Sequence, residues 1–274
     1  MENNGSLGRN LPAYASKRIG AINWLGVWTL YMKEVRRFFK VIGQTVLSPV
    51  ITTALFMTVF TIALGGGGRY SGDVPFALFL APGLVIMAVL QNSFANTVSS
   101  LMTSKMQGNI VDLLLAPLGP GEMTLAFTLA AATRGVLVGL FVTLSMFFFT
   151  EMTFPHVWAL LYYGLSAAIM LALLGIMAGI WAEKWEQSTS ITNFVIVPLS
   201  FLSGTFYSID RLPGIWRDIS QFNPFFYLID GFRYGITDHS DGNIVIGVAY
   251  CAILNVILGV ICYRMFSSGY KLRP

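Results

Sequence analysis

Charged residues are scarce in this sequence of 274 residues. Asp, Glu, Lys and Arg make up 11% of the chain, hydrophobic residues make up 55%, and the mean hydropathy is +0.68. An ordinary soluble domain carries about 25% charged residues. The shortage of charge therefore excludes a soluble protein and predicts an all-α integral membrane protein.

Cysteine and histidine are also sparse, with two of each. Cys251 and Cys262 fall on one predicted helix, about 16 Å apart at 1.5 Å per residue, and this distance exceeds the reach of a disulfide. The two His residues, His156 and His239, form no cluster with metal-ligand spacing. The sequence thus predicts neither a redox site nor a metal site.

Motifs for catalysis are missing as well. The chain has no GxxxxGK[ST] phosphate loop, no Ser/His/Asp arrangement and no pair of carboxylates inside a predicted span. We therefore expect no catalytic residue and no cofactor in this chain, and we expect no proton coupling. The net charge of +4 needs no nucleic-acid partner, because basic residues next to anionic lipid account for it.

Long apolar windows are what the sequence does contain. Each bilayer crossing needs roughly 20 mainly apolar residues, and six windows qualify: 44–64, 76–98, 128–150, 157–181, 191–208 and 244–266. They form a six-span domain over 44–266, between tails at 1–20 and 267–274. Most Lys and Arg residues then lie on the side of the termini, and the bias of basic residues toward the cytoplasm predicts that both termini are cytoplasmic. The basic residues on the other side are Arg69, Arg211, Arg217 and Arg233.

Residues 21–43 precede the first span and predict an amphipathic helix. One stripe of side chains is basic, and the other is mainly aromatic. Such a helix lies in the membrane surface, either as a simple anchor or as a lever that passes motion to the first span. The aromatic stripe comprises Trp24, Trp28, Tyr31, Val35, Phe38 and Ile42, and the basic stripe comprises Lys33, Arg37 and Lys40.

Polar and charged residues also occur inside the predicted spans. Asn92, Asn96 and Ser99 share one face of the second span, where they either form interhelical hydrogen bonds or line a pathway. Arg134 in the third span would cost about 2.5 to 3.5 kcal/mol at the bilayer centre. We therefore expect it either to extend to the inner interface or to find an acidic partner.

Small residues recur at GxxxG spacing in the third and fourth spans. The pairs are Gly135 with Gly139 and Gly175 with Gly179. This spacing lets two helices approach closely. We expect packing within one subunit rather than dimerisation.

The segment 205–236 predicts two helices that are too short to span. They are Pro213–Phe222 and Pro224–Gly235, with Asn223 as the cap of the second. We expect a re-entrant pair that dips into the outer leaflet under a cover of protein. Asp230 and Arg233 are spaced to form an ion pair there and to neutralise one another.

The stretch NIVDLLLAPLGPG lies in the inner loop between the second and third spans. Asn109 can cap a short helix, Asp112 suits its first turn, and Pro117 with the Gly-Pro-Gly at 119–121 would end it. An exposed apolar patch marks either a partner site or a contact with the membrane surface. The leucines expected to form that patch are Leu113, Leu114, Leu115 and Leu118.

These motifs occur in a familiar order. DLLLAPLGPGEM is followed by AGIWAEKWEQ, and then by PLSFLSGTFYSIDRLP with NPFFYLIDGFRYG, while FLAPG stands at 79–83. From about residue 20 onward, the chain resembles the type-two ABC transporter permease family. It is most similar to the bacterial branch that includes drug, polysaccharide and nodulation-factor exporters.

The resemblance implies the permease subunit of an exporter in the bacterial inner membrane. It implies two separate ATPase subunits that bind ATP and magnesium, and a second permease copy in a homodimer. Residues 105–121 would be the coupling helix, with Asn109, Asp112 and the four leucines against the ATPase and Glu183 and Glu186 as a lesser contact. The first, second and fifth spans would line the pathway, with Asn92, Asn96, Ser99 and Asn193 as candidates and the segment of Asp230 and Arg233 as an outer lid.

Two other functions remain open at this stage. A channel or ion-driven carrier would work without any ATPase, and a membrane scaffold would recruit a cytoplasmic partner without moving a solute. The substrate also remains open, because spans rich in Phe and Met suit lipids and drugs, whereas the amides suit a glycan.

Overall fold

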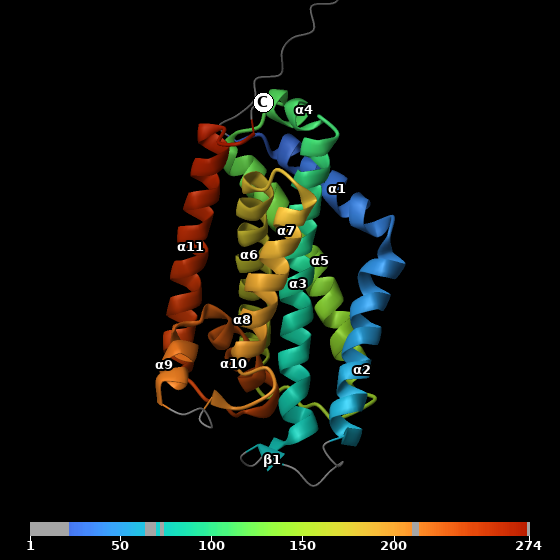
Figure 1. Ribbon diagram of the computed structural model, residues 1–274, viewed down its shortest axis with the longest axis vertical. Helices are drawn as coiled ribbons and strands as arrows, with labels where there is room; N and C mark the ends of the chain where they lie inside the picture. Colours follow the sequence, from blue (N-terminus) through green and yellow to red (C-terminus); the bar gives the residue numbers. More distant parts are fainter. Residues whose placement is uncertain (1–21, 64–69, 72–73, 210–213, 273–274) are drawn as a thin grey trace, which may run out of the picture.

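The computed structural model describes residues 22–63, 70–71, 74–209 and 214–272. It confirms an all-α protein whose longest helices run side by side (Figure 1). The only strands in the described residues, β1 (Tyr70–Ser71) and β2 (Val74–Pro75), pair antiparallel. The helices are α1 (Trp24–Phe39), α2 (Ser48–Ala63), α3 (Phe76–Met106), α4 (Ile110–Leu115), α5 (Pro120–Met146), α6 (Val157–Trp181), α7 (Trp185–Ile191), α8 (Val197–Leu202), α9 (Gly214–Phe222), α10 (Pro224–Thr237) and α11 (Ile244–Ser268), with two π-helical segments, η1 (Gly43–Leu47) and η2 (Thr192–Ile196).

Five helical stretches in the described residues are long and apolar enough to cross a membrane. They correspond to the predicted spans one, two, three, four and six, so the prediction of six is not confirmed in this form. In place of the fifth span, 191–208, the segments α7, η2 and α8 follow one another without a break over 185–202. This stretch begins six residues earlier than predicted and takes in the polar residues at 186–193, which lower its mean hydropathy.

Two predicted spans have different bounds in the structure. α3 continues to Met106 rather than ending near 98, because protein rather than lipid covers its polar side chains, among them the buried Asn96 and Ser100. α5 begins at Pro120, where we expected a helix to stop. A proline at the first helical position has no N–H to leave unpaired, so Pro120 starts α5 instead of ending the preceding helix.

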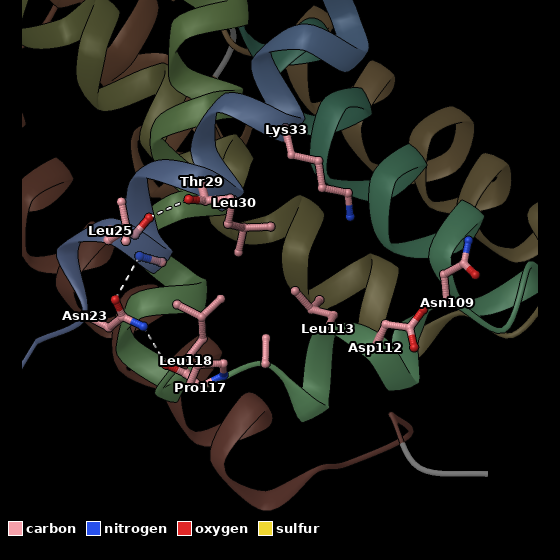
Figure 2. Close-up of a pocket in the computed structure, with 12 residues that line it drawn as sticks. Asn23, Leu25, Thr29, Leu30, Lys33, Asn109, Asp112, Leu113, Pro117 and Leu118 are labelled. Atoms are coloured by element: carbon pink, nitrogen blue, oxygen red, sulfur yellow. Dashed lines mark hydrogen bonds between the residues drawn. The ribbon is translucent and has the colours of Figure 1, made fainter. Parts of the chain in front are cut away.

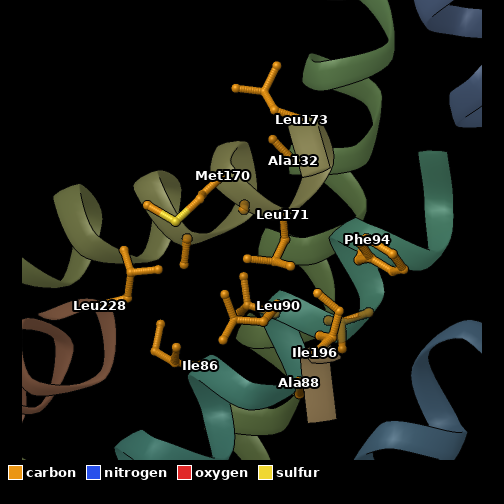
Figure 3. Close-up of a cluster of buried hydrophobic side chains, with 14 of the residues drawn as sticks. Ile86, Ala88, Leu90, Phe94, Ala132, Met170, Leu171, Leu173, Ile196 and Leu228 are labelled. Carbon is orange, nitrogen blue, oxygen red and sulfur yellow. The ribbon is translucent and has the colours of Figure 1, made fainter. Parts of the chain in front are cut away.

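α3 forms the centre of the bundle, with α5 and α6 packed along it. Figure 3 shows this core, in which Leu90 of α3 lies near Leu171 of α6, and Ala132 of α5 lies near Leu173 of α6. The GxxxG glycines make the close approach possible. A Cβ on Gly175 would lie 2.0 Å from Thr97 Oγ1, and one on Gly135 would lie 2.0 Å from Ser93 Oγ. The prediction that these glycines pack within one subunit is confirmed.

The amphipathic helix is shorter than the predicted 21–43, and residue 21 lies outside the described residues. α1 packs mainly on α5 and buries Val27, Leu30, Glu34 and Phe38. The predicted aromatic stripe is divided between two environments, because Val35 and Phe38 are buried whereas Trp24 and Trp28 are exposed. Arg37, which we assigned to the outer basic stripe, turns inward toward α3.

The two ends of the bundle differ (Figure 1). α4, the start of α1 and the end of α11 lie at one end, and the β1–β2 hairpin lies with α9 and α10 at the other. The predicted short pair is present as α9 and α10, although Pro213 lies outside the described residues. α10 packs between α6, α3 and α11. Protein therefore covers α10, as a re-entrant helix requires.

Asp230 and Arg233 of α10 form the predicted ion pair, with Arg233 Nη1 4.0 Å from Asp230 Oδ1. Arg233 also donates to the carbonyl oxygens of Phe79 (3.2 Å) and Gly204 (2.7 Å), and its guanidinium lies 3.8 Å from the Phe79 ring centroid. Asp230 accepts the backbone N–H groups of Asp241 and Gly242, each at 2.9 Å. Backbone groups therefore stabilise both charges and tie α10 to its neighbours.

Candidate functional site

The predicted coupling helix, residues 105–121, is much shorter in the structure. α3 occupies its first positions, α4 comprises only Ile110–Leu115, and α5 begins at Pro120. Asn109 stands at the cap position of α4, but its side-chain amide donates to Gln107 Oε1 (3.2 Å) rather than capping the helix. Asp112 lies in the first turn, as predicted, and is exposed.

The four leucines do not form one exposed patch. Leu113 is 8% exposed and belongs to the core, and Leu114 and Leu118 are half-buried against it. Leu115 is 78% exposed, and Val111, one helical turn earlier, is 43% exposed. The prediction of a leucine patch is therefore wrong for Leu113, because residues four apart share a helix face and that face carries Val111 and Leu115. We call Val111, Asp112 and Leu115 the α4 outer face.

A groove separates α4 from α1. Its volume is about 640 Å³, and Figure 2 shows Lys33 and Leu30 of α1 opposite Leu113 of α4 across it. Asn109 and Asp112 stand at one side, whereas Asn23, Pro117 and Leu118 close the other. The α4 outer face and this α1–α4 groove together give this end of the bundle an apolar surface with charged edges.

Glu122 ties α1 to the connection between α4 and α5. One carboxylate oxygen accepts the backbone N–H of Asn23 (2.6 Å), and the other accepts the N–H of Gly119 (2.7 Å). The Asn23 side chain donates to the Pro117 carbonyl (2.9 Å) and accepts from Gly26 N–H (2.9 Å), which caps α1. Sequence analysis missed Glu122, although a glutamate at the third position of a helix is a local capping signal.

We expect Glu122→Gln to loosen this junction. The amide keeps the shape of the side chain but replaces one acceptor oxygen with a donor that faces a backbone N–H. Hydrogen bonds to charged groups contribute about 1.5 to 3 kcal/mol, so the free energy of unfolding should fall by about that amount. Thermal unfolding of the purified protein in detergent measures the change. Glu151→Gln, at an exposed loop carboxylate near the far end, should leave the midpoint unchanged, and equal midpoints for the two variants would contradict the assignment.

Glu183 and Glu186, the predicted lesser contact, follow the end of α6. Glu183 forms an exposed ion pair with Lys271 (2.7 Å), and the hydrogen bond and charge of Lys271 lower the pKa of its carboxyl from the ordinary value. Glu186 is exposed in the first turn of α7. Lys105, at the end of α3, donates to the carbonyl oxygens of Ile180 (2.5 Å) and Ala182 (2.8 Å). This lysine thereby fixes the end of α6 to α3 beside the Glu183–Lys271 pair.

A polar cavity of about 690 Å³ lies between α2, α3, α5 and η2. Three of the four pathway candidates, Asn92, Ser99 and Asn193, line it. Asn96 does not, since it is fully buried behind the cavity wall and accepts a hydrogen bond from Arg37 (3.1 Å). The structure thus brings the first, second and fifth predicted spans together around one polar space.

Two arginines line this polar cavity. Arg134 pairs with no carboxylate among the described residues; it donates to Asn92 Oδ1 (3.2 Å) from the middle of α5. Arg37 reaches in from α1, where Glu34 holds it at 2.9 Å. The role of Arg37 was not predicted from the sequence, where the local signal was the spacing of Glu34 and Arg37, three residues apart.

The comparisons with known proteins agree with this architecture. Residues 26–237 match the ABC-2 type transporter family. The chain is 32% identical over 251 residues to the Inner membrane transport permease YadH of Escherichia coli K12, covering 91% of this chain and 98% of that protein. It is 24% identical over 251 residues to Nodulation protein J of Rhizobium leguminosarum bv. viciae, covering 87% of this chain and 91% of that protein. The family predicted from the sequence motifs is confirmed: the chain belongs to the ABC-2 type transporter family and is a transmembrane permease.

Proposed function

We propose that this permease exports its substrate by using ATP hydrolysed in separate ATPase subunits, which dock on the α4 outer face. The observation that carries the proposal is the 78% exposure of Leu115 on a helix of six residues between two membrane spans. An exposed apolar patch marks a partner site, and Val111, 43% exposed on the same helix face, extends the patch that Leu115 begins. α4 is six residues long and connects α3 to α5 in the chain. A displacement of α4 would therefore displace the adjoining ends of both helices.

The contacts of the α4–α5 connection supply a route from that docking surface to the polar cavity. Glu122 links the α4–α5 connection to the start of α1. α1 continues through η1 into α2, and α1, α3 and α5 contribute Arg37, Asn92 and Arg134 to the cavity wall. Closure of the ATPases would then change the packing around the cavity, because α4 contacts them differently in their open and closed states.

The proposed assembly contains two copies of this permease and two ATPase subunits. The ATPases bind ATP and magnesium, and this chain has no catalytic role. It lies in the bacterial inner membrane with both termini cytoplasmic, which places α4 in the cytoplasm. α9 and α10, with Asp230 and Arg233, then form a lid on the outer side, and the substrate is a lipid-like, drug-like or glycan molecule.

The test is co-expression of the permease with each ABC ATPase subunit of its own genome, followed by reconstitution in lipid vesicles. We expect one of these ATPases to purify with the permease as one complex, and we expect its ATP turnover in vesicles to change at least severalfold when the permease is present. The ATPase alone is the control. Solute flux through the permease without any ATPase would favour a channel or carrier, and a tight complex without flux would favour a scaffold; either result would refute the proposal.

A further inference from the structure

The polar cavity carries an excess of positive charge. Arg37 from α1 and Arg134 from α5 line it, whereas no Asp or Glu of the described residues does. The nearest carboxylate in the described hydrogen-bond network is Glu34, whose side chain is 1% exposed and accepts a hydrogen bond from the Nε of Arg37. Charges inside a membrane bundle are costly unless they are paired. Two cations with one carboxylate therefore leave one positive charge without a counter-ion.

The two arginines differ in how fully they are hydrogen-bonded. Arg37 donates through Nε to Glu34 (2.9 Å), through Nη1 to Ser99 Oγ (3.0 Å) and through Nη2 to the Asn96 carbonyl (2.7 Å). Arg134 has one neutral partner, Asn92, and its Nε is buried without a hydrogen-bond partner in the described part of the chain. A buried donor without an acceptor is destabilising. The free donor therefore belongs to Arg134, while Arg37 is a fixed second cation.

The wall of the cavity is unusual in backbone as well as in charge. Both π-helical segments of the described chain reach it, η1 through Gln44 and Thr45 and η2 through Thr192 and Asn193. π-Helical turns are rare and occur frequently at functional sites. Phe56 and Met87 add an apolar part to the lining. The volume of about 690 Å³ lies within the range of sites for small ligands.

We propose that this cavity binds the anionic headgroup of an amphiphile, a phosphate or carboxylate whose oxygens accept hydrogen bonds from Arg134. A guanidinium offers paired donors that match the oxygens of either group. Arg37 adds a second positive charge without giving up its own partners, and the apolar lining takes the adjoining part of the chain. Binding of the amphiphile to the cavity needs no ATPase. Only the statement that this amphiphile is the transported cargo rests on the proposed function.

The experiment measures binding to the full-length permease in micelles of an uncharged maltoside detergent. Radiolabelled dodecyl phosphate is the probe, and unlabelled dodecanol, dodecanoate and inorganic phosphate are the competitors. We expect dodecyl phosphate and dodecanoate to compete at least 10-fold better than dodecanol. Arg134→Gln should weaken probe binding at least 10-fold, and Arg134→Lys should restore part of it. Arg264→Gln, which removes an exposed arginine of α11, should bind like the wild type.

A second variant guards against misfolding of the Arg134 variants. Gln91→Glu keeps both arginines and places a carboxylate of nearly the same shape in the cavity lining. This internal counter-ion should lower probe affinity by a similar factor in a protein that elutes normally from a sizing column. Inorganic phosphate that competes as well as dodecyl phosphate would assign a soluble anion to the site and overturn the amphiphile. Dodecanol that competes equally, or unchanged affinity in both variants, would overturn the anion site.

The outcome is separable from that of the proposed function. If the probe binds in an Arg134-dependent way but no ATPase joins the permease, the site stands and ATP-driven export fails. If the complex forms and turns over ATP but the probe does not bind, export stands and the anionic amphiphile is excluded. In vesicles that hold the complex, dodecyl phosphate should also raise ATP turnover of the wild type and not of Gln91→Glu. A lipid that is bound only for structural support would not raise ATP turnover. Unchanged ATP turnover would therefore exclude the anionic amphiphile as the cargo.

Discussion

Leu115→Asp should remove the coupling between this permease and its ATPase while leaving the permease itself folded. The side chain is 78% exposed in the described structure, and exposed substitutions usually change the free energy of unfolding by no more than about 0.5 kcal/mol. In the complex, the same position would be buried against the ATPase. Losing the burial of a leucine costs about 1.5 to 3 kcal/mol, and a carboxylate without a partner adds a desolvation cost. At 1.4 kcal/mol for each factor of ten, the affinity should fall at least 10-fold and export should be lost.

The measurement combines co-purification with ATP turnover in vesicles. Leu115→Met keeps an apolar side chain of similar volume, so it should retain the complex and most of the turnover. Leu113→Ala is the structural contrast, because Leu113 is buried and its truncation should lower the stability of the permease by about 2 to 5 kcal/mol. Wild-type turnover and export in Leu115→Asp would show that α4 is not the docking surface.

Local signals account for the parts of the fold that the sequence predicted well. The Asn-Pro pair before α10 specifies a helix start, and Asn223 does accept the Phe225 N–H at 3.0 Å. The bounds of α9 and α10 therefore agree with prediction to within two residues. Span positions follow from hydropathy alone, which is why five of them reappear as long helices. Helix capping and hydropathy depend on residues that are close together in the sequence. Both can therefore be read from a single sequence.

The polar groups that shape the site depend on contacts far apart in the sequence. Glu122 meets Asn23 across 99 positions, and Arg37 meets Asn96 across 59. On a helical projection, Arg37 belongs with Lys33 and Lys40, and only the position of α3 shows that it turns inward. Single-sequence periodicity places a residue on a face of its own helix but does not identify the helix that covers this face. The orientation of the basic stripe was therefore predicted wrongly at that residue.

Gly175→Val should lower the stability of the permease and its yield of folded protein, and it also separates the two roles that a GxxxG pair can have. A Cβ at Gly175 would lie 2.7 Å from the Phe94 carbonyl oxygen, a backbone atom, and 2.0 Å from Thr97 Oγ1. Thr97 itself donates to the carbonyls of Phe94 and Ala172, each at 3.1 Å, where α3 meets α6. Because α3 and α6 share the most extensive contact in the bundle, neither can move without disturbing the core.

Overpacking a tight site costs about 1 to 3 kcal/mol and sometimes more, and here a backbone clash adds to it. Total stability is only about 5 to 15 kcal/mol, so Gly175→Val should lower the unfolding midpoint in detergent and reduce the amount of folded protein that elutes from a sizing column. Gly259→Val is the matched control, since a Cβ there meets nothing within 4 Å, and its yield should equal that of the wild type. If the glycine served dimerisation instead, Gly175→Val would elute as a folded monomer with a normal unfolding midpoint. That elution profile would contradict packing within one subunit. A Cβ at Gly175 would lie 2.7 Å from the Phe94 carbonyl oxygen, so a valine could not fit between α3 and α6 without a loss of stability.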